Sequence, residues 1–179
     1  MYYGDIKKID TANCIGVGVS LFVSGCRNHC KNCFNPETWC FTYGKEFTSE
    51  TLSELMEYCK PDYISGLTIL GGDPSEPENR DTVLEICKKF KDLYPDKLLM
   101  MYTGYYIEDL IEDDVMLNIF RLLDVLIDSP FEDDKKVAGL RLRGSTNQRL
   151  IDMKKTIKDY DKNNKLDIKL FDYKNYHLY

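Results

Sequence analysis

Residues 15–33 read IGVGVSLFVSGCRNHCKNC, an apolar run followed at once by three closely spaced cysteines. The run at 15–23 is rich in valine, isoleucine, leucine and phenylalanine, which predicts a buried β-strand. Gly16 and Gly18 leave room there for close approach of another backbone or of a ligand. We therefore expect a core strand that ends in a cysteine-bearing loop at 26–33.

Similar apolar runs return later in the chain and alternate with amphipathic segments. Strands are predicted at 67–70, 97–102 and 125–128. Helices are predicted at 48–60, 78–93 and 107–123, the last interrupted near 112–114. This alternation indicates an α/β fold whose parallel strands are joined by right-handed crossovers, with the ligand at the carboxyl ends of the strands. The loops at those ends begin at Cys26, Gly71, Thr103 and Asp128.

The pattern weakens after residue 128. Residues 137–142 and 150–154 are candidate strands, and 156–164 suits either a helix or a polar tail.

The composition and charge of the chain exclude several classes of protein. The 179 residues carry 24 Lys and Arg against 30 Asp and Glu, a formal charge of −6, which argues against a general nucleic-acid binder. No apolar run approaches the ~20 residues of a membrane span, and residues 1–8 lack the apolar core of a signal peptide. We expect a cytoplasmic protein that binds no membrane. In that compartment the seven cysteines are expected as reduced thiols, metal ligands or catalytic groups.

Cys26, Cys30 and Cys33 form a Cys-x3-Cys-x2-Cys pattern on one short loop. Three thiolates can hold three corners of an iron-sulfur cube and leave its fourth iron open to a ligand. A zinc site with His29 as fourth ligand is the alternative. The cluster is favoured, because zinc sites usually pair two separated cysteine pairs and no second pair exists here.

This cysteine pattern, followed by Gly71-Gly72-Asp73-Pro74 after the next strand, resembles the radical S-adenosylmethionine enzymes. Four further stretches narrow the resemblance to the activating proteins of anaerobic ribonucleoside-triphosphate reductases, over residues 10–148. These stretches are 22–26, 33–39, 102–105 and 143–148.

The resemblance implies a 4Fe-4S cluster that binds S-adenosylmethionine through its open iron. It also implies radical transfer to a glycine of the large reductase subunit, with a low-potential electron donor such as flavodoxin. The matched length is too short for a closed barrel of ~250 residues, so the implied fold is a partial (β/α) barrel of about five to six parallel strands. The radical S-adenosylmethionine domain is expected at 1–148, with a C-terminal extension at 149–179.

The resemblance also implies roles for individual residues. The cluster ligands would be Cys26, Cys30 and Cys33. The cofactor-binding residues would be Asn32, Cys33, Phe34, Gly71, Gly72, Asp73, Thr103, Asp128 and Asn147. Gly72 would come closest to the methionine ammonium. Thr103 as a helix cap and Asp128 as the start of a turn are equally good readings.

The chain differs from the family pattern at three positions. Asn32 stands where an aromatic residue or, in this family, glycine is expected, and Ser129 stands where glycine is expected. His29 lies one place later than the expected loop histidine.

The remaining cysteines, the tryptophan and the second histidine are expected to have structural roles or are assigned none. Cys59 and Cys87 are expected as core thiols, and Cys14 and Cys40 as structural cysteines. Trp39 is expected to pack, and His177 is assigned no role.

Two other functions remain open at this stage. One is a radical S-adenosylmethionine enzyme with another target, such as a formate-lyase-type activator or a carboxydeazaguanine synthase. The other is a non-catalytic protein with an iron-sulfur or zinc site.

Overall fold

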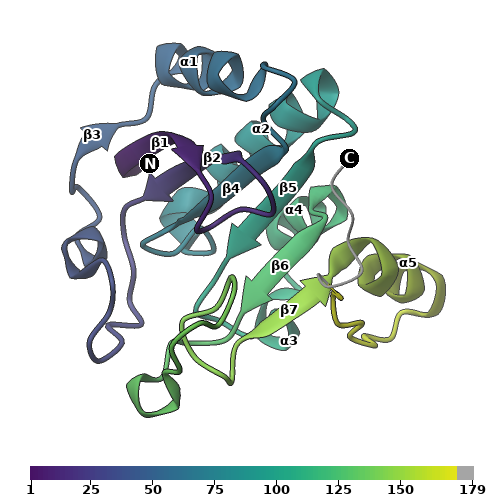
Figure 1. Ribbon diagram of the computed structural model, residues 1–179. Coiled ribbons are helices and arrows are strands. Elements are labelled where there is room, and N and C mark those ends of the chain that lie inside the picture. Colours follow the sequence, from purple (N-terminus) through teal and green to yellow (C-terminus); the bar gives the residue numbers. More distant parts are fainter. Residues whose placement is uncertain (173–179) are drawn as a thin grey trace.

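The computed structural model describes residues 1–172, in which seven strands form one sheet in the order β3-β1-β2-β4-β5-β6-β7 (Figure 1). The strands are β1 (Tyr2–Asp10), β2 (Gly18–Val23), β3 (Lys45–Glu46), β4 (Gly66–Gly71), β5 (Leu98–Tyr102), β6 (Val125–Asp128) and β7 (Arg149–Asp152). The central strands β2, β4, β5 and β6 are parallel. The strands β1, β3 and β7 pair antiparallel at the two sides of this parallel core.

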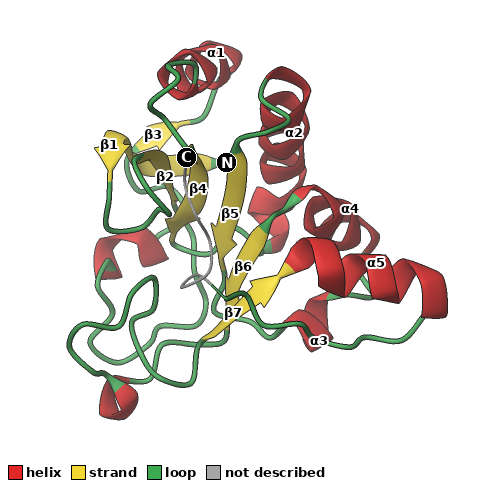
Figure 2. Cartoon of the chain, turned by 45° about the vertical axis from the view of Figure 1, so that its right-hand side comes forward, coloured by secondary structure: helices red, strands yellow, loops and turns green. Residues whose placement is uncertain are grey.

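Helices cover one face of the sheet (Figure 2). The helices are α1 (Ser49–Cys59), α2 (Pro77–Leu93), α3 (Ile107–Leu110), α4 (Asp114–Leu122) and α5 (Met153–Asn163), with 3-10 turns η1 (Pro36–Trp39) and η2 (Asp133–Lys135). Side chains cap three of them: Thr48 accepts from the Thr51 N–H, Asp113 from Met116 and Asp152 from Lys155. None of the helices in residues 1–172 has the length and apolar character needed to cross a membrane.

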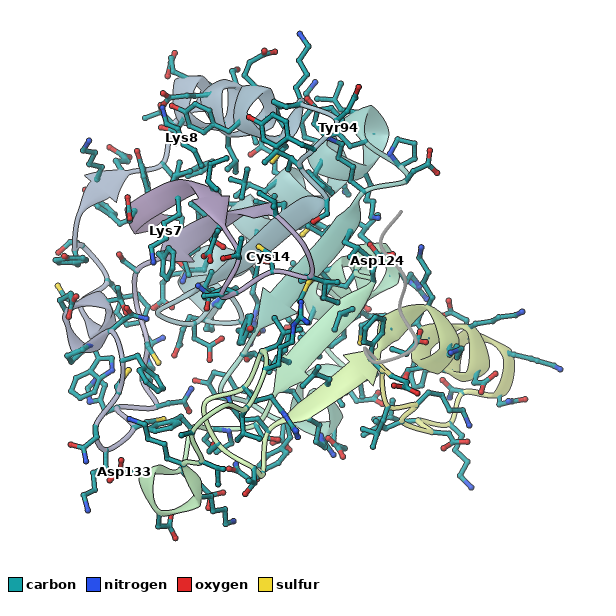
Figure 3. The ribbon with its side chains drawn as sticks, in the orientation of Figure 1. Lys7, Lys8, Cys14, Tyr94, Asp124 and Asp133 are labelled. Atoms are coloured by element: carbon teal, nitrogen blue, oxygen red, sulfur yellow. The ribbon has the colours of Figure 1, made fainter. Side chains whose placement is uncertain are left out.

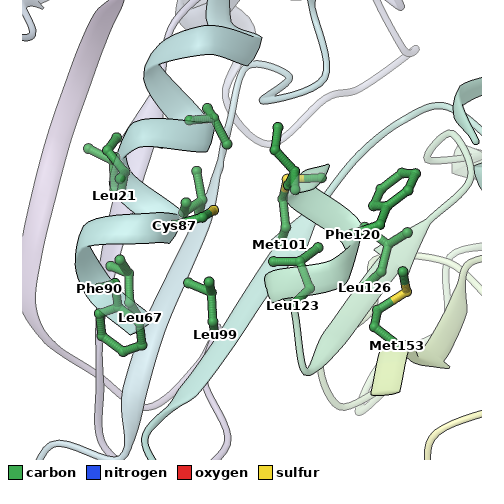
Figure 4. Close-up of a cluster of buried hydrophobic side chains, with 14 of the residues drawn as sticks. Leu21, Leu67, Cys87, Phe90, Leu99, Met101, Phe120, Leu123, Leu126 and Met153 are labelled. Atoms are coloured by element: carbon green, nitrogen blue, oxygen red, sulfur yellow. The ribbon is translucent and has the colours of Figure 1, made fainter. Parts of the chain in front are cut away.

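The two faces of the sheet carry different apolar clusters, because successive strand residues point to opposite faces. In β5, Leu99 and Met101 face the helices, where they pack with residues such as Phe90 and Phe120 (Figure 4). Leu98 and Met100 point to the other face and join a smaller cluster. Loop residues, among them Ile15 and Leu142, cover that second cluster. The helix-covered face is therefore the main core, and the second face is left to loops.

Most of the predicted elements are confirmed. Strands β4, β5, β6 and β7 correspond to the predictions at 67–70, 97–102, 125–128 and 150–154, the interrupted helix at 107–123 is present, and 156–164 belongs largely to helix α5. The alternating α/β pattern is therefore confirmed.

The sheet corrects three sequence-based predictions. It has four parallel strands rather than five to six, since β1 and β7 join it antiparallel. Strand β1 was missed, because its sequence YYGDIKKID has charged side chains and lies on a largely exposed ribbon. Residues 137–142 form no strand, because Gly139 and Leu142 adopt positive φ angles of 82° and 60° and interrupt any extended run.

The chain after residue 148 adds β7 and α5 to the same sheet and core. The Asp152 N–H donates to the Lys169 carbonyl at 2.8 Å, which keeps the segment after α5 beside β7. A domain boundary at residue 148 stays a prediction. His177 lies outside the described residues.

Candidate active site

A cavity of about 400 Å³ lies on the loop-covered face, at the carboxyl ends of the parallel strands. Its size is in the range of pockets that take a small molecule. Side chains from both ends of the chain line it, including Lys7 of β1 and Arg143 in the segment before β7. Figure 3 shows Lys7 on its strand and Asp133 beside the cysteine loop.

The cysteine loop forms one wall of this cavity. Cys26, Cys30 and Cys33 all line it and all carry free thiols. Cys26 is buried, and the other two are half-buried. Burial raises the pKa of the Cys26 thiol to about 11 and also raises the pKa of Cys30. Metal binding requires thiolates, so loading of this loop must release protons.

The backbone holds the cysteine loop against η1. Gly25 adopts a φ of +95° and donates its N–H to the Thr38 carbonyl at 2.8 Å, and Cys26 donates to Trp39 at 3.2 Å. The Asn35 N–H donates to the sulfur of Cys33 at 3.5 Å. Hydrogen bonds of this kind to a cysteine sulfur tune the potential of a bound iron-sulfur cluster.

Gly71 and Gly72 have a packing reason to be glycine. Gly71 adopts a φ of +108°, and a Cβ at Gly72 would come within 2.6 Å of the Gly25 carbonyl oxygen and 2.9 Å of the Thr38 oxygen. Two hydrogen bonds lock the same contact: Gly72 N–H to Val23 O at 2.7 Å and Asp73 N–H to Gly25 O at 2.8 Å. The glycine pair therefore fits tightly under the start of the cysteine loop.

Asp73 joins three loops at the floor of the cavity. Its buried carboxylate accepts hydrogen bonds from the Asn28 side chain at 3.1 Å, the Thr103 hydroxyl at 3.0 Å and the Gly104 N–H at 2.8 Å. The Ser75 N–H adds a bond at 2.9 Å. Burial raises the pKa of Asp73 to about 6, although these donors favour the ionised form. Asp73 thus connects the cysteine loop to the ends of β4 and β5.

The opposite wall is the segment between β6 and β7, residues 129–148. Gln148 organises its base: the side-chain oxygen accepts the Gly144 N–H at 2.7 Å, and the side-chain amide donates to Ser129 O at 3.3 Å. The ring of Phe131 in this segment contacts the ring of Phe34, the residue after the cysteine loop, with 5.1 Å between the centroids. The two walls are therefore in contact beside the cavity.

Comparison with known proteins identifies the family. Residues 12–151 match the family model described as a 4Fe-4S single cluster domain. Anaerobic ribonucleoside-triphosphate reductase-activating proteins align with the chain over 150 residues. Those of Enterobacteria phage T4 and Pasteurella multocida (strain Pm70) are both 38% identical to it, covering 84% and 83% of this chain and 93% and 95% of the relatives. That of Escherichia coli (strain K12) is 31% identical, covering 83% of this chain and 96% of the relative.

The chain belongs to the family of anaerobic ribonucleoside-triphosphate reductase-activating proteins. The region matched to the 4Fe-4S domain contains both walls of the cavity. We therefore ask whether the cysteine loop of this activating-protein family member could hold an iron-sulfur cluster.

The cysteine loop fits such a cluster. Its three free thiols line one cavity, and a backbone N–H already points at the sulfur of Cys33. His29, the ligand in the zinc alternative, stacks its ring on Trp39 with 4.6 Å between the centroids. Among residues 1–172, no three Cys, His, Asp or Glu side chains gather as a site for a single metal ion.

The structure gathers most of the residues predicted to bind a cofactor. Those that line the cavity are Cys33, Phe34, Gly71, Gly72, Asp73 and Thr103. Thr103 lines the cavity and donates its hydroxyl to Asp73, but it is not the helix cap: the N-cap of α3 is Tyr106, and Thr103 accepts the Tyr105 N–H at 3.2 Å in the turn before the helix.

Three predicted cofactor-binding residues do not line the cavity, because protein partners hold their side chains. Asp128 is buried and accepts two bonds from Arg149, at 2.9 and 2.5 Å. Asn147 donates to Pro130 O at 2.8 Å. The exposed Asn32 donates to Asp133 at 2.7 Å, which joins the two walls.

Glu76 is a supporting residue that the sequence did not reveal. It is 1% exposed and accepts the Arg27 N–H at 2.7 Å, the Arg27 guanidinium at 2.5 Å and the Tyr105 hydroxyl at 3.0 Å. Its bonds anchor the residue that follows Cys26. No local pattern announces this role, because the partners lie 49 and 29 positions away.

The structure also shows where the four other cysteines and Trp39 lie. Cys59 and Cys87 are buried among the helices of the main core, as predicted. Cys14 is buried beside Thr68, with 3.1 Å between sulfur and hydroxyl, and Cys40 is exposed. Trp39, for which a packing role was favoured over a catalytic one, stacks its ring on that of His29 and also lines the cavity.

Proposed function

We propose that this chain is a radical S-adenosylmethionine activating enzyme, which generates a glycyl radical on an anaerobic ribonucleoside-triphosphate reductase. One observation carries the proposal: three free cysteine thiols and the Gly71-Gly72-Asp73 turn line the same cavity. Three thiolates can hold a 4Fe-4S cluster and leave one iron for a ligand. The family to which the chain belongs supports the reductase as the target.

Different residues around the cavity would hold the cluster and bind S-adenosylmethionine. Cys26, Cys30 and Cys33 would hold the cluster, while Gly72 would face the methionine ammonium with its backbone carbonyl. A reduced 4Fe-4S cluster held there would supply the single electron for cleavage of S-adenosylmethionine to methionine and a 5'-deoxyadenosyl radical, and that radical would become 5'-deoxyadenosine by taking a hydrogen atom from the target glycine. Phe22 and Leu70 add apolar lining, which limits the access of water to the reacting atoms.

The partner would reach the cavity from the loop-covered face. Within residues 1–172 the apolar cluster on this face contains no helix residue, so a glycine loop of the large reductase subunit would enter the cavity from this side. A low-potential carrier such as flavodoxin would supply the electron, in the cytosol, where free thiols persist. A partial (β/α) barrel with its catalytic unit in residues 1–148 is the architecture that suits this entry.

The proposal is tested without oxygen on the reconstituted protein mixed with the reductase. A glycyl radical detected by electron paramagnetic resonance, dependent on S-adenosylmethionine and a reductant, is the expected result. An intact reduced cluster that binds S-adenosylmethionine but gives no radical on the reductase would point to a different target. Zinc alone in metal analysis would instead support a non-catalytic binding protein.

A further inference from the structure

Arg143 differs from four other arginines of the described chain. Ion pairs with carboxylates hold Arg27, Arg80, Arg121 and Arg149. Arg143 lines the cavity, and within residues 1–172 its guanidinium makes one hydrogen bond, from Nη1 to the Gln148 carbonyl at 3.2 Å. Its Nε atom is buried and has no partner. The cavity thus contains a half-buried cation that no carboxylate of the described chain compensates.

Arg143 lines the same cavity as the three cysteines, and the residue after it lies beside the end of the cysteine loop. A Cβ on the next residue, Gly144, would come within 2.9 Å of the Phe131 ring and 3.0 Å of the Phe34 ring. Phe34 directly follows Cys33, a proposed cluster ligand. A ligand that meets the cysteine loop is therefore within reach of the Arg143 segment.

A half-buried guanidinium without a carboxylate partner would be stabilised by an anionic ligand. A partly buried charge without a partner costs free energy, and the planar fork of arginine matches a carboxylate with two parallel hydrogen bonds. The other cation of the lining, Lys7, is exposed and lies 4.9 Å over the Phe22 ring, so its charge is already solvated.

We propose that Arg143 binds the carboxylate of S-adenosylmethionine. This inference rests on the proposed function, because it takes the ligand from there. It adds a residue of the second wall to the binding site and explains why a cation without a carboxylate partner faces the cavity. Arg143 holds the amino-acid end of the ligand beside the cysteines, and the Gly71-Gly72 turn holds it from the other wall.

The test compares two ligands on two proteins. Equilibrium dialysis without oxygen gives the dissociation constants of S-adenosylmethionine and of decarboxylated S-adenosylmethionine, for the cluster-loaded wild type and for Arg143→Gln. The substitution should raise the dissociation constant of S-adenosylmethionine roughly 10- to 100-fold. It should change that of the decarboxylated compound by less than about 2-fold, because the group that Arg143 holds is missing there.

Two variants serve as controls. Arg141→Gln removes the same charge two positions earlier, from an exposed residue that does not line the cavity, and should leave both dissociation constants unchanged. Arg143→Lys keeps the charge but loses the fork, and should recover part of the affinity for S-adenosylmethionine. Iron and sulfide content must be equal in all four proteins, which makes a lost cluster visible.

The outcomes separate this inference from the proposed function. Wild type that binds S-adenosylmethionine while Arg143→Gln binds it equally well overturns the role of Arg143 alone. Equal losses for both ligands would mean a disturbed cavity and would also overturn it. An Arg143→Gln variant with normal affinity that fails to produce the glycyl radical would assign the residue to the partner. A wild type that binds no S-adenosylmethionine overturns both proposals.

Discussion

The two faces of the sheet show how one fold separates stability from chemistry. The helix-covered face buries a continuous apolar cluster that includes Leu67, Phe90 and Phe120, all with no exposed surface. The loop-covered face has a smaller apolar cluster, and the cavity lies on the same face. Hydrogen bonds to the buried carboxylate of Asp73 hold together the loops that line this cavity. Substitutions on the two faces should therefore have different consequences.

The largest effect on function is expected at Cys26. Cys26→Ser removes one of three proposed cluster ligands, so bound iron and sulfide and the radical on the reductase should be lost almost completely. The fold should survive, because serine is similar in size and the main core lies on the other face. Iron analysis and circular dichroism check the two halves of this prediction. The matched control is Cys87→Ser, which should keep the cluster.

The largest effect on stability is expected at Phe90, on the opposite face. Phe90→Ala empties a fully buried site of the main core and should lower the free energy of unfolding by about 3–5 kcal/mol. Urea unfolding of the metal-free protein measures this change. Folded Phe90→Ala protein at low temperature should still take up iron and sulfide. Loss of cluster binding in that folded variant would contradict the separation of the two faces.

A smaller, pH-dependent effect is expected at Asp73. Its pKa of about 6 in the folded protein exceeds the ordinary value of 3.8, so the folded state binds the proton more tightly than the unfolded state. Stability should therefore fall as the pH rises from about 4 to about 6, by about 2–3 kcal/mol, and then level off. Asp73→Asn cannot ionise and should lose this slope. Urea unfolding of both metal-free proteins between pH 4 and 7 makes the comparison, and equal slopes would refute it.

The smallest effect is expected at Ser129, which adopts a φ of 81° at a position where the sequence resemblance predicts glycine. Glycine occupies this left-handed region without strain. Ser129→Gly should change the free energy of unfolding by no more than about 1 kcal/mol, in the stabilising direction, since the hydroxyl makes a single 3.2 Å bond to Asp128. Thermal unfolding measures the shift. A clear loss of stability would show that this bond outweighs the strain.

Local patterns predicted the parts of the molecule whose causes are local. The cysteine loop and the Gly71-Gly72-Asp73 turn follow directly from strands whose apolar runs can be read from the sequence. The same reading predicted that they meet, since the carboxyl ends of parallel strands share one edge of a sheet.

Long-range partners explain what the sequence did not reveal. Asp128 ends its strand as predicted, but Arg149, 21 positions later, occupies its carboxylate. Glu76 anchors the cysteine loop through partners on two other segments. Strand β1 pairs with β2 despite its charged sequence. Each of these depends on contacts formed only in the folded chain.

The most direct test of the cavity as a cofactor site is a spectrum of the reduced, reconstituted protein before and after S-adenosylmethionine is added without oxygen. An open iron held beside Gly72 should bind the ligand, so the electron paramagnetic resonance signal of the cluster should change in the wild type. A 4Fe-4S signal that stays the same at saturating S-adenosylmethionine would contradict the account.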